Sequence, residues 1–416
     1  MLELLKKRGI TFLGFSNTIS QLGDRLTHMV IITLIGSMFP GRVSAFSEFA
    51  ITWSLPIVIL SPFAGVFIEH WNKQTIMLRC HVIQSILIFL TPTFVVLTHS
   101  ILPIWILIIA FFSLDMFNNT SKNAIIPDLV EYDELVAANS LIIILARIAT
   151  FIGMVGGGYL VKWVGWRFGF YIDASTHLIA GLLVLGMGTK SLFAPVKKLE
   201  FSLRKELKKS ARLFFQDLKE LGGLLIKDRV VIFVMLSVFI LPFVAAVAYI
   251  ILIYLVQQIF GLGTTGVGWF GGVIGIGMLI GGLLMGFFGK MINRGKIIII
   301  SIAVLGFFFI IGPIFTTPFF LYTIAFIAGM VFSFIGIAQD TMLQEDVLKG
   351  IRGRVFATKE FVINLTVVIS AIFFGAISKF FSPYPIIRGV GVFLMIIMVF
   401  AILIFRSIPP AVRAKL

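Results

Sequence analysis

The chain is poor in charge and nearly devoid of cysteine. Only 13% of its 416 residues are charged, whereas 59% are hydrophobic, and the mean hydropathy is +1.07. A soluble globular protein carries roughly twice that share of charge, and a disordered chain lacks so much apolar surface. The single cysteine, Cys80, rules out an intramolecular disulfide. The composition therefore indicates an integral membrane protein.

Short segments of alternating hydrophobicity, which are typical of an outer-membrane barrel, are also missing. The apolar runs are long and continuous instead, as in 101–114 and 297–312. A membrane-spanning helix needs roughly 20 apolar residues, so the sequence predicts an all-α protein with twelve spans. The predicted spans are 10–36, 46–68, 76–98, 102–120, 137–161, 168–189, 230–256, 266–288, 297–317, 318–338, 355–378 and 389–405.

Sequence motifs of common enzymes are absent as well. The chain has no glycine-rich loop ending in Gly-Lys-Ser/Thr, no His-Glu-x-x-His and no Gly-x-Ser-x-Gly. An ATP-driven pump and a hydrolase are therefore unsupported. We expect no enzyme activity and no cofactor.

Basic residues are distributed unevenly between the predicted loops. If the N-terminus is cytoplasmic, the cytoplasmic segments hold 25 Lys and Arg residues and the outer loops hold 5. This bias predicts that both termini lie on the cytoplasmic side of the plasma (inner) membrane. The net charge of +15 then reflects positive loops on the cytoplasmic side, where membrane lipids are the expected partner, and implies no nucleic acid.

The longest polar segment, 190–229, follows the sixth predicted span. It separates an N-terminal six-helix bundle, 1–189, from a C-terminal six-helix bundle, 230–416. Within the segment, apolar residues at spacings of three and four accompany a basic face, which predicts an amphipathic helix on the membrane surface. A regulatory or partner-binding segment is the alternative.

The two halves share a weak repeat. Gly65 precedes the loop after the second span, and Gly286 precedes the loop after the eighth span, 221 residues later. Duplicated six-helix halves related by pseudo-symmetry are a recurring plan of transporters. The pattern therefore favours a transport protein.

Ionisable residues near the middle of a span are costly in hydrocarbon and are therefore candidates for function. Nearly all of them lie in the N-terminal half, whereas Lys359 and Glu360 lie near one end of the eleventh span. The N-terminal candidates are Asp24, His28, Asp115, Arg147, Asp173 and His177.

The first span carries a polar stripe. Its members follow spacings of four, three and four residues, so they share one helix face. We expect this face to line a water-filled cavity together with Asn118 of the fourth span, and a buried hydrogen-bond network is the alternative. The stripe consists of Asn17, Gln21, Asp24 and His28.

Arg147 needs a carboxylate or carbonyl partner inside the membrane because it keeps its charge. Asp24 and Asp115 are the acids expected at a similar depth. An acid that is protonated in one conformation and ionised in another couples transport to protons, and Asp24 is the expected carrier. A fixed structural ion pair is the alternative. Asp24 and His28 are also weak candidates for metal ligands, but without further Cys or His we expect no metal site.

Small and aromatic residues mark two further features. Gly153, Gly157 and Gly158 in the fifth span allow close packing between helices. In the seventh span, Tyr249 and Tyr254 are candidates for the wall of a substrate site, and Pro242 predicts a break in the helix. Ordinary core and lipid-facing packing is the alternative for these aromatic residues.

The loop after the second span resembles the signature of the major facilitator superfamily, Gly-x-x-x-Asp-Arg/Lys-x-Gly-Arg/Lys-Arg/Lys. Gly65 and Lys73 match it, and Glu69 replaces the aspartate. The resemblance implies that these residues form a conformational latch. It also implies two six-helix bundles around a central cavity, with the first, fourth, seventh and tenth spans lining it.

Other stretches are similar to particular branches of that superfamily. The fifth span resembles the drug/proton antiporter motif Gly-Pro-x-x-Gly-Gly, with Met154 in place of proline. Segment 124–147 and Arg352-Gly-Arg-Val355 resemble macrolide-efflux proteins and the enterobactin exporter. Gly23-Asp24 is also similar to lysophospholipid transporters, and Gly23-Asp24-Arg25-x-x-His28 to ferroportin.

These features predict a monomeric, proton-coupled exporter of amphipathic or hydrophobic small molecules, such as drugs, macrolides or siderophores. The polar N-terminal half would handle coupling, and the apolar C-terminal half would contact the cargo. A lysophospholipid flippase, a ferroportin-like metal exporter and a membrane scaffold or sensor are the alternatives, in that order.

Overall fold

The computed structural model describes most of the membrane-embedded chain. The described residues are 4, 6–70, 72–131, 134–188, 208, 212–216, 219, 223, 229–288, 292–314, 317–346 and 352–410. These residues contain helices and short connections but no strand. The α-helices are α1 (Arg8–Met38), α2 (Val43–His70), α3 (Lys73–Thr98), α4 (Leu102–Ile125), α5 (Leu135–Gly186), α7 (Arg229–Val247), α8 (Gly263–Phe288), α9 (Arg294–Ile311), α10 (Pro318–Asp346), α11 (Arg352–Ile377) and α12 (Pro383–Ser407).

The twelve predicted spans correspond to these helices. Nine described helices are long and apolar enough to cross a membrane. α5 contains two of the predicted spans, because Gly165 adopts φ 78° and ψ 166° and interrupts the helical backbone. Dividing α5 at Gly165, and adding α1 and the apolar stretch Phe361–Ile377, gives twelve membrane helices. The all-α membrane fold is therefore as predicted.

The helices group into two compact units. Unit 1 comprises Met1–Met38, Leu55–Leu213 and Gly263–Trp269. Unit 2 comprises Phe39–Ser54, Phe214–Leu262 and Phe270–Leu416. The amphipathic helix predicted within 190–229 lies outside the described residues, apart from a few isolated positions.

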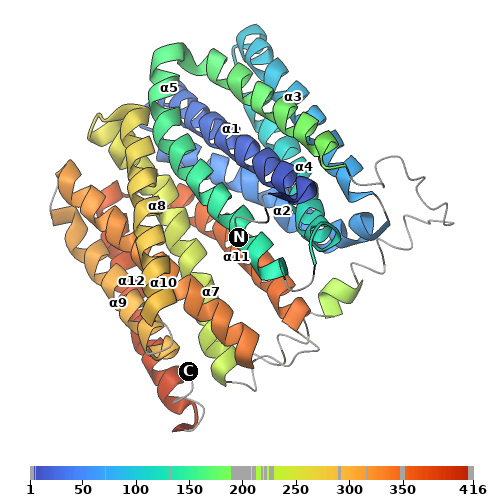
Figure 1. Cartoon of the computed structure of the whole chain (residues 1–416). Helices are drawn as coiled ribbons and strands as arrows, with labels where there is room; N and C mark the ends of the chain where they lie inside the picture. Colours follow the sequence, from blue (N-terminus) through green and yellow to red (C-terminus); the bar gives the residue numbers. More distant parts are fainter. Residues whose placement is uncertain are drawn as a thin grey trace. The chain divides into compact units, whose positions relative to one another are not determined.

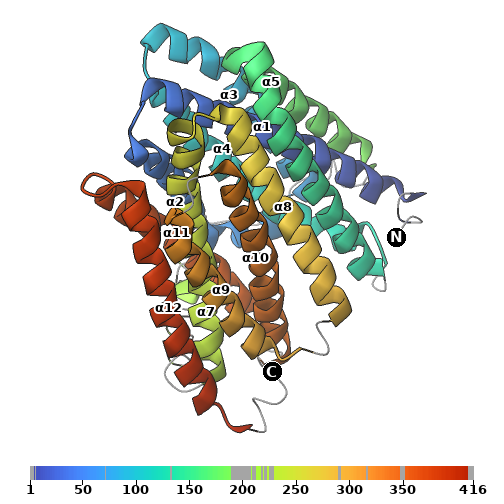
Figure 2. The same cartoon turned by 90° about the vertical axis from the view of Figure 1, so that its left-hand side faces the viewer.

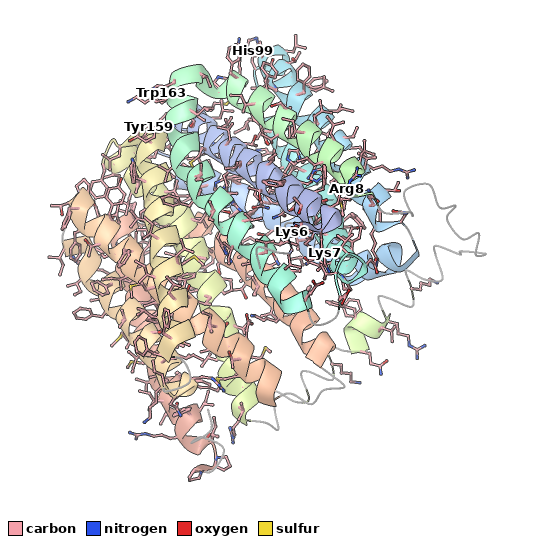
Figure 3. All side chains as sticks on the ribbon, viewed as in Figure 1. Lys6, Lys7, Arg8, His99, Tyr159 and Trp163 are labelled. Atoms are coloured by element: carbon pink, nitrogen blue, oxygen red, sulfur yellow. The ribbon has the colours of Figure 1, made fainter. Side chains whose placement is uncertain are left out.

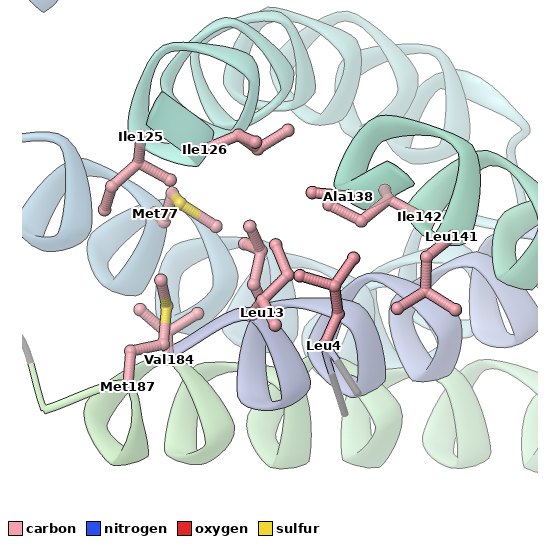
Figure 4. Packing of buried hydrophobic residues seen from close by; sticks show 11 residues of the cluster. Leu4, Leu13, Met77, Ile125, Ile126, Ala138, Leu141, Ile142, Val184 and Met187 are labelled. Carbon is pink, nitrogen blue, oxygen red and sulfur yellow. The ribbon is translucent and has the colours of Figure 1, made fainter. Parts of the chain in front are cut away.

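In unit 1, α1 packs along both arms of α5, and α3 packs against α4 and α5 (Figure 1). Apolar side chains fill one end of this bundle, where Leu13, Met77 and Val184 gather from three helices (Figure 4). Lys6 and Arg8 lie at one end of the unit, and Trp163 lies at the other (Figure 3). Basic residues at one end and aromatic side chains at an interface are both typical of helical bundles that cross a bilayer.

In unit 2, α9 packs against α12, and α7 packs against α11 (Figure 2). Glycines permit close approach between α8 and α10. A Cβ atom on Gly277 would lie 2.1 Å from the Phe326 carbonyl oxygen, and one on Gly281 would lie 2.6 Å from the Met330 carbonyl oxygen. Only glycine fits at such positions, so the two helix backbones pack directly on one another.

The break predicted at Pro242 is wrong in position. α7 continues through Pro242 to Val247, and the helix then changes to π-helical turns at Ala248–Leu252 (η4) and Leu255–Ile259 (η5). Proline removes one backbone hydrogen bond, but a helix buried by its neighbours tolerates this loss. The irregular backbone therefore begins after Pro242 and surrounds Tyr249 and Tyr254.

Candidate functional site

A cluster of ionisable side chains is centred on His177, in the second arm of α5. Its Nε2 atom lies 3.1 Å from Asp24 Oδ1 and 3.7 Å from Asp173 Oδ1. Its Nδ1 atom lies 3.2 Å from Nδ1 of His81. The side chain of His177 is 2% exposed, that of Asp173 is 0% exposed and that of Asp24 is 16% exposed. The cluster therefore joins α1, α3 and α5 inside unit 1.

Local sequence explains why these groups meet. Asp173 and His177 are four residues apart and share one helix face. Gly23 presents no side chain to them, and a Cβ atom there would lie 2.1 Å from Asp173 Oδ1. Thr176 donates to Asp173 Oδ1 at 3.0 Å, which fixes the carboxylate. The edge of the Phe111 ring packs against the His177 imidazole.

The contact between the two imidazoles constrains their protons. When both rings are neutral, one Nδ1 donates and the other accepts, so only one of these two atoms carries a proton. If His177 donates from Nε2 to Asp24, its Nδ1 accepts from His81 Nδ1. In this tautomer protons can pass from His81 through His177 to Asp24. In the reversed tautomer, in which a protonated Asp24 donates to His177 Nε2, they can pass from Asp24 through His177 to His81.

The same cluster meets the geometric requirement for a metal ion. Asp24, Asp173 and His177 each offer one ligand atom, and these atoms lie within 4.8 Å of one another. His28, which the sequence pairs with Asp24 as a weak metal candidate, is not in this group. It lies one turn further along α1 and is half-buried.

A second polar cluster joins α1 and α4. Lys122 Nζ donates to Asn17 Oδ1 at 2.9 Å and to Asn119 Oδ1 at 2.7 Å. Asn119 Nδ2 donates to Asp115 Oδ2 at 2.8 Å. Asn118 is buried on the same helix. The sequence predicts a loop around Lys122, but α4 extends to Ile125 and carries this residue into the bundle.

The charge pairing predicted for Arg147 is not found among the described residues. No described carboxylate lies within ion-pair distance of its guanidinium, and its side chain is exposed. Asp24 contacts His177 and Asp115 contacts Asn119 instead. On α1, Gln21 accepts a long hydrogen bond of 3.5 Å from Arg25.

The predicted latch is described only in part. Lys73 Nζ donates to Asp128 Oδ2 at 2.8 Å and to the Ala124 carbonyl at 2.8 Å, which ties the start of α3 to the end of α4. The surroundings of Gly65 and the side chain of Glu69 lie outside the part of the chain that the structure describes.

A second ion pair of unit 1 joins Lys7 to Glu134. The hydrogen bond from Lys7 holds the pKa of the Glu134 carboxyl below its usual range. This contact ties the segment before α1 to the start of α5.

The glycines of the fifth span face neighbouring backbones. A Cβ atom on Gly153 would lie 2.8 Å from Arg25 Cβ, and one on Gly157 would lie 3.3 Å from Leu26 Cα. Gly158 faces the start of α8, where a Cβ atom would lie 3.0 Å from the Thr264 carbonyl oxygen. Close packing of α5 against α1 depends on Gly153 and Gly157.

The aromatic candidates lie in unit 2. The Tyr249 ring stacks on Trp53 with a centroid distance of 5.7 Å and an interplanar angle of 18°. Tyr254 is half-buried between the two π-helical segments. A separate apolar cavity of about 550 Å³ lies between α7, α11 and α12. Its wall includes Phe239, Phe243, Phe373, Phe374, Phe381 and Phe393.

The sequence analysis did not identify three residues that make polar contacts inside the helical units: His81, Lys122 and Asp340. His81 stands alone in its span, and only the fold brings it to His177. Lys122 follows a polar stretch that resembles a loop. Asp340 also falls in a predicted loop, but α10 continues to Asp346, and Lys359 of α11 donates a hydrogen bond to it. α4 and α10 therefore extend beyond their predicted ends, and Lys122 and Asp340 lie in the added turns.

Membrane helices that hold acids, imidazoles and a lysine inside their bundle are typical of a polytopic transport protein. A Major Facilitator Superfamily (MFS) profile matches residues 13–358 and 234–416. The chain belongs to the Major Facilitator Superfamily.

Two relatives come from Bacillus subtilis (strain 168). The candidate bacilysin exporter BacE is 23% identical over 385 residues, which cover 91% of this chain and 89% of BacE. The uncharacterized MFS-type transporter YfiS is 22% identical over 178 residues, which cover 43% of this chain and only 42% of YfiS. These similarities agree with the family and with a membrane location.

Solved structures of MFS transporters share the fold. The nucleoside transporter NupG superposes with a TM-score of 0.72 at 14% identity, covering 96% of this chain and 99% of NupG. A bacterial homologue of the human lysosomal transporter Spinster, inward-facing and unoccupied, gives 0.69 at 15% identity, covering 95% and 96% of the two chains. At these identities the likeness concerns the fold alone.

Proposed function

We propose that this MFS transporter is a proton-coupled exporter of amphipathic or hydrophobic small molecules. The contact of 3.1 Å between Asp24 and His177 carries the proposal. An acid and an imidazole in direct contact exchange a proton without exposing a new charge to hydrocarbon. Similarity to the candidate exporter BacE supports outward transport. The transporter acts as a monomer in the plasma membrane with both termini cytoplasmic.

In this proposal Asp24 is the proton carrier, and His177 and His81 extend its reach. Asp24 is the most exposed member of the cluster, so it meets the aqueous path first. A proton received by Asp24 passes to His177, whose other nitrogen faces His81. Alternating access then exposes the loaded and unloaded cluster to opposite sides of the membrane.

The proposal is tested with Asp24→Asn in proteoliposomes. The amide keeps the size of the side chain but cannot carry the proton. We expect loss of pH-gradient-driven accumulation of the amphipathic probe dansyl-phenylalanine, with gradient-free exchange of the probe retained. Retained exchange shows that the variant folds and binds. Unchanged gradient-driven accumulation would exclude Asp24 as the carrier.

Glu48→Gln provides the control for removing one carboxylate. Glu48 is exposed and pairs only weakly with Arg42, at 3.4 Å. An exposed pair contributes roughly 0–1 kcal/mol. We expect this variant to retain both accumulation and exchange.

A lysophospholipid flippase is the second candidate, favoured by the phenylalanine-lined cavity of unit 2. An acyl chain fits an apolar cavity of about 550 Å³ better than a polar cargo does. Translocation of a fluorescent lysophospholipid that is independent of the pH gradient and insensitive to Asp24→Asn would favour this candidate.

Metal export is a third candidate, favoured by the carboxylate and imidazole groups of Asp24, Asp173 and His177. Cobalt(II), whose absorption spectrum reports its ligands, distinguishes the two interpretations of this cluster. If the cluster binds a metal, adding cobalt(II) should give an absorption spectrum that His177→Gln changes. If the cluster serves proton coupling alone, His177→Gln should leave the cobalt(II) spectrum unchanged.

A further inference from the structure

We propose that Lys122 and Asn17 bind the carboxylate of an anionic cargo. This inference rests on the proposed export function, because it names the cargo of that exporter. Binding of the carboxylate can nevertheless be measured without a pH gradient. The site lies between α1 and α4 in unit 1, and neither Lys122 nor Asn17 is hydrogen-bonded to a member of the His177 cluster in the described contacts. It narrows the substrate class to amphipathic molecules that carry a carboxylate.

The first observation concerns the charge of Lys122. Its ammonium donates to two amide oxygens, those of Asn17 and Asn119. Among the described residues, no carboxylate lies within ion-pair distance of it. An ammonium group has three donors and requires an anion when it enters a membrane bundle. One donor of Lys122 is therefore available to a ligand, and no carboxylate contacts its ammonium directly.

The nearest acid does not fill this role. Asp115 lies on the same helix, but its carboxylate accepts from Asn119 Nδ2 at 2.8 Å. Asn119 therefore stands between Asp115 and Lys122 and contacts both. The Asp115 carboxylate therefore offsets part of the local positive charge but does not contact the Lys122 ammonium.

The second observation concerns Asn17. This residue is only 7% exposed. Its Nδ2 atom has no hydrogen-bond partner among the described residues, although its Oδ1 atom accepts from Lys122. A buried donor without an acceptor is rare and indicates a missing partner.

The two donors lie side by side because Asn17 Nδ2 and Oδ1 belong to one planar amide. Lys122 contacts that Oδ1 atom, so its ammonium is also close to Nδ2. A carboxylate presents two oxygens in a matching plane and can accept from both donors at once. A neutral amide in its place lacks the negative charge that Lys122 requires.

The inference is tested by equilibrium fluorescence anisotropy with the full chain in neutral lipid nanodiscs. The probes are dansyl-phenylalanine and its uncharged amide. We expect the wild type to bind the acid about 10-fold more tightly than the amide, as a charge-assisted pair requires. Lys122→Gln should remove this preference, and Lys122→Arg should keep most of it.

Asn17→Asp supplies a second, independent variant. It places a carboxylate of the protein beside Lys122, and this carboxylate occupies the position that we assign to the carboxylate of the cargo. We expect loss of the preference for the acid over the amide. Lys162→Gln is the control, because Lys162 is an exposed cation of the same unit; this variant should bind both probes as the wild type does.

Equal binding of acid and amide by the wild type would overturn the inference, as would a preference that survives both Lys122→Gln and Asn17→Asp. Failure of the Asp24→Asn transport test leaves this binding test intact, so the two proposals fail separately.

Discussion

At the scale of single residues, Gly23 sets the distance between α1 and the second arm of α5. A Cβ atom there would lie 1.9 Å from Thr176 Oγ1 and 2.1 Å from Asp173 Oδ1. The contact between Asp24 and His177 spans the same two helices. A side chain at Gly23 would therefore separate the groups that we assign to proton transfer.

Gly23→Ala should destabilise the protein by about 1–3 kcal/mol, because overpacking forces the helices apart. Thermal unfolding in detergent measures the effect as a lower Tm. Gly156→Ala is the matched control, since nothing lies within 4 Å of a Cβ atom at Gly156. In a helix that substitution is neutral or stabilising by up to about 1 kcal/mol. Equal Tm values for the two variants would contradict the close packing at Gly23.

His81→Phe tests the imidazole chain. His177 would lose the partner of its Nδ1 atom, and proton exchange with Asp24 would slow. We expect gradient-driven accumulation of dansyl-phenylalanine to fall by about 10-fold or more, in line with the contribution of a positioned proton donor. Gradient-free exchange should remain. A His99→Asn control changes an exposed histidine at the end of the same helix, and it should transport normally.

Charge and helical spacing in the sequence were enough to predict several residues of the candidate site. Asp24, Asp173 and His177 stand out because a charge inside an apolar run is costly. The partners of these residues did not stand out, because His81 comes from another helix and only the fold brings it to His177. Lys122 was missed because the apolar run of α4 ends where its polar face begins.

At the scale of elements, the internal repeat is visible in the helix caps. The Asn72 side chain accepts from the Thr75 backbone at the start of α3, and the Asn293 side chain accepts from the Lys296 backbone at the start of α9. The two caps have nearly equal backbone angles, φ −66° and ψ 115° against φ −68° and ψ 118°. The offset of Gly65 from Gly286 also relates Asn72 to Asn293. The weak sequence repeat therefore reflects equivalent helix starts.

Asn72→Ala and Asn293→Ala should each cost about 1 kcal/mol, because each leaves a backbone N–H of the first turn without an acceptor. Thermal unfolding measures both losses, and the serine variants should restore most of the stability. A loss at only one of the two positions would show that the caps, although similar in geometry, differ in energy.

At the scale of the whole molecule, the number of membrane helices was predictable. Bilayer thickness fixes the length of an apolar run, so the spans could be counted from hydropathy. A polar linker marks connectivity, whereas packing defines the units. Segment 39–54 precedes the polar linker 190–229 but groups with unit 2. Segment Gly263–Trp269 follows that linker but groups with unit 1.

The scarcity of cysteine makes the orientation of the chain in the membrane testable. Cys80 is buried, so a membrane-impermeant maleimide should leave the wild type unlabelled in intact cells. Lys6 and Lys162 are exposed, and the positive-inside bias places them on opposite sides of the membrane. In intact cells the reagent should label Lys162→Cys but not Lys6→Cys, and permeabilisation should make Lys6→Cys reactive. Labelling of Lys6→Cys in intact cells would show the opposite orientation of the chain. The proton gradient would then drive the cargo in the opposite direction.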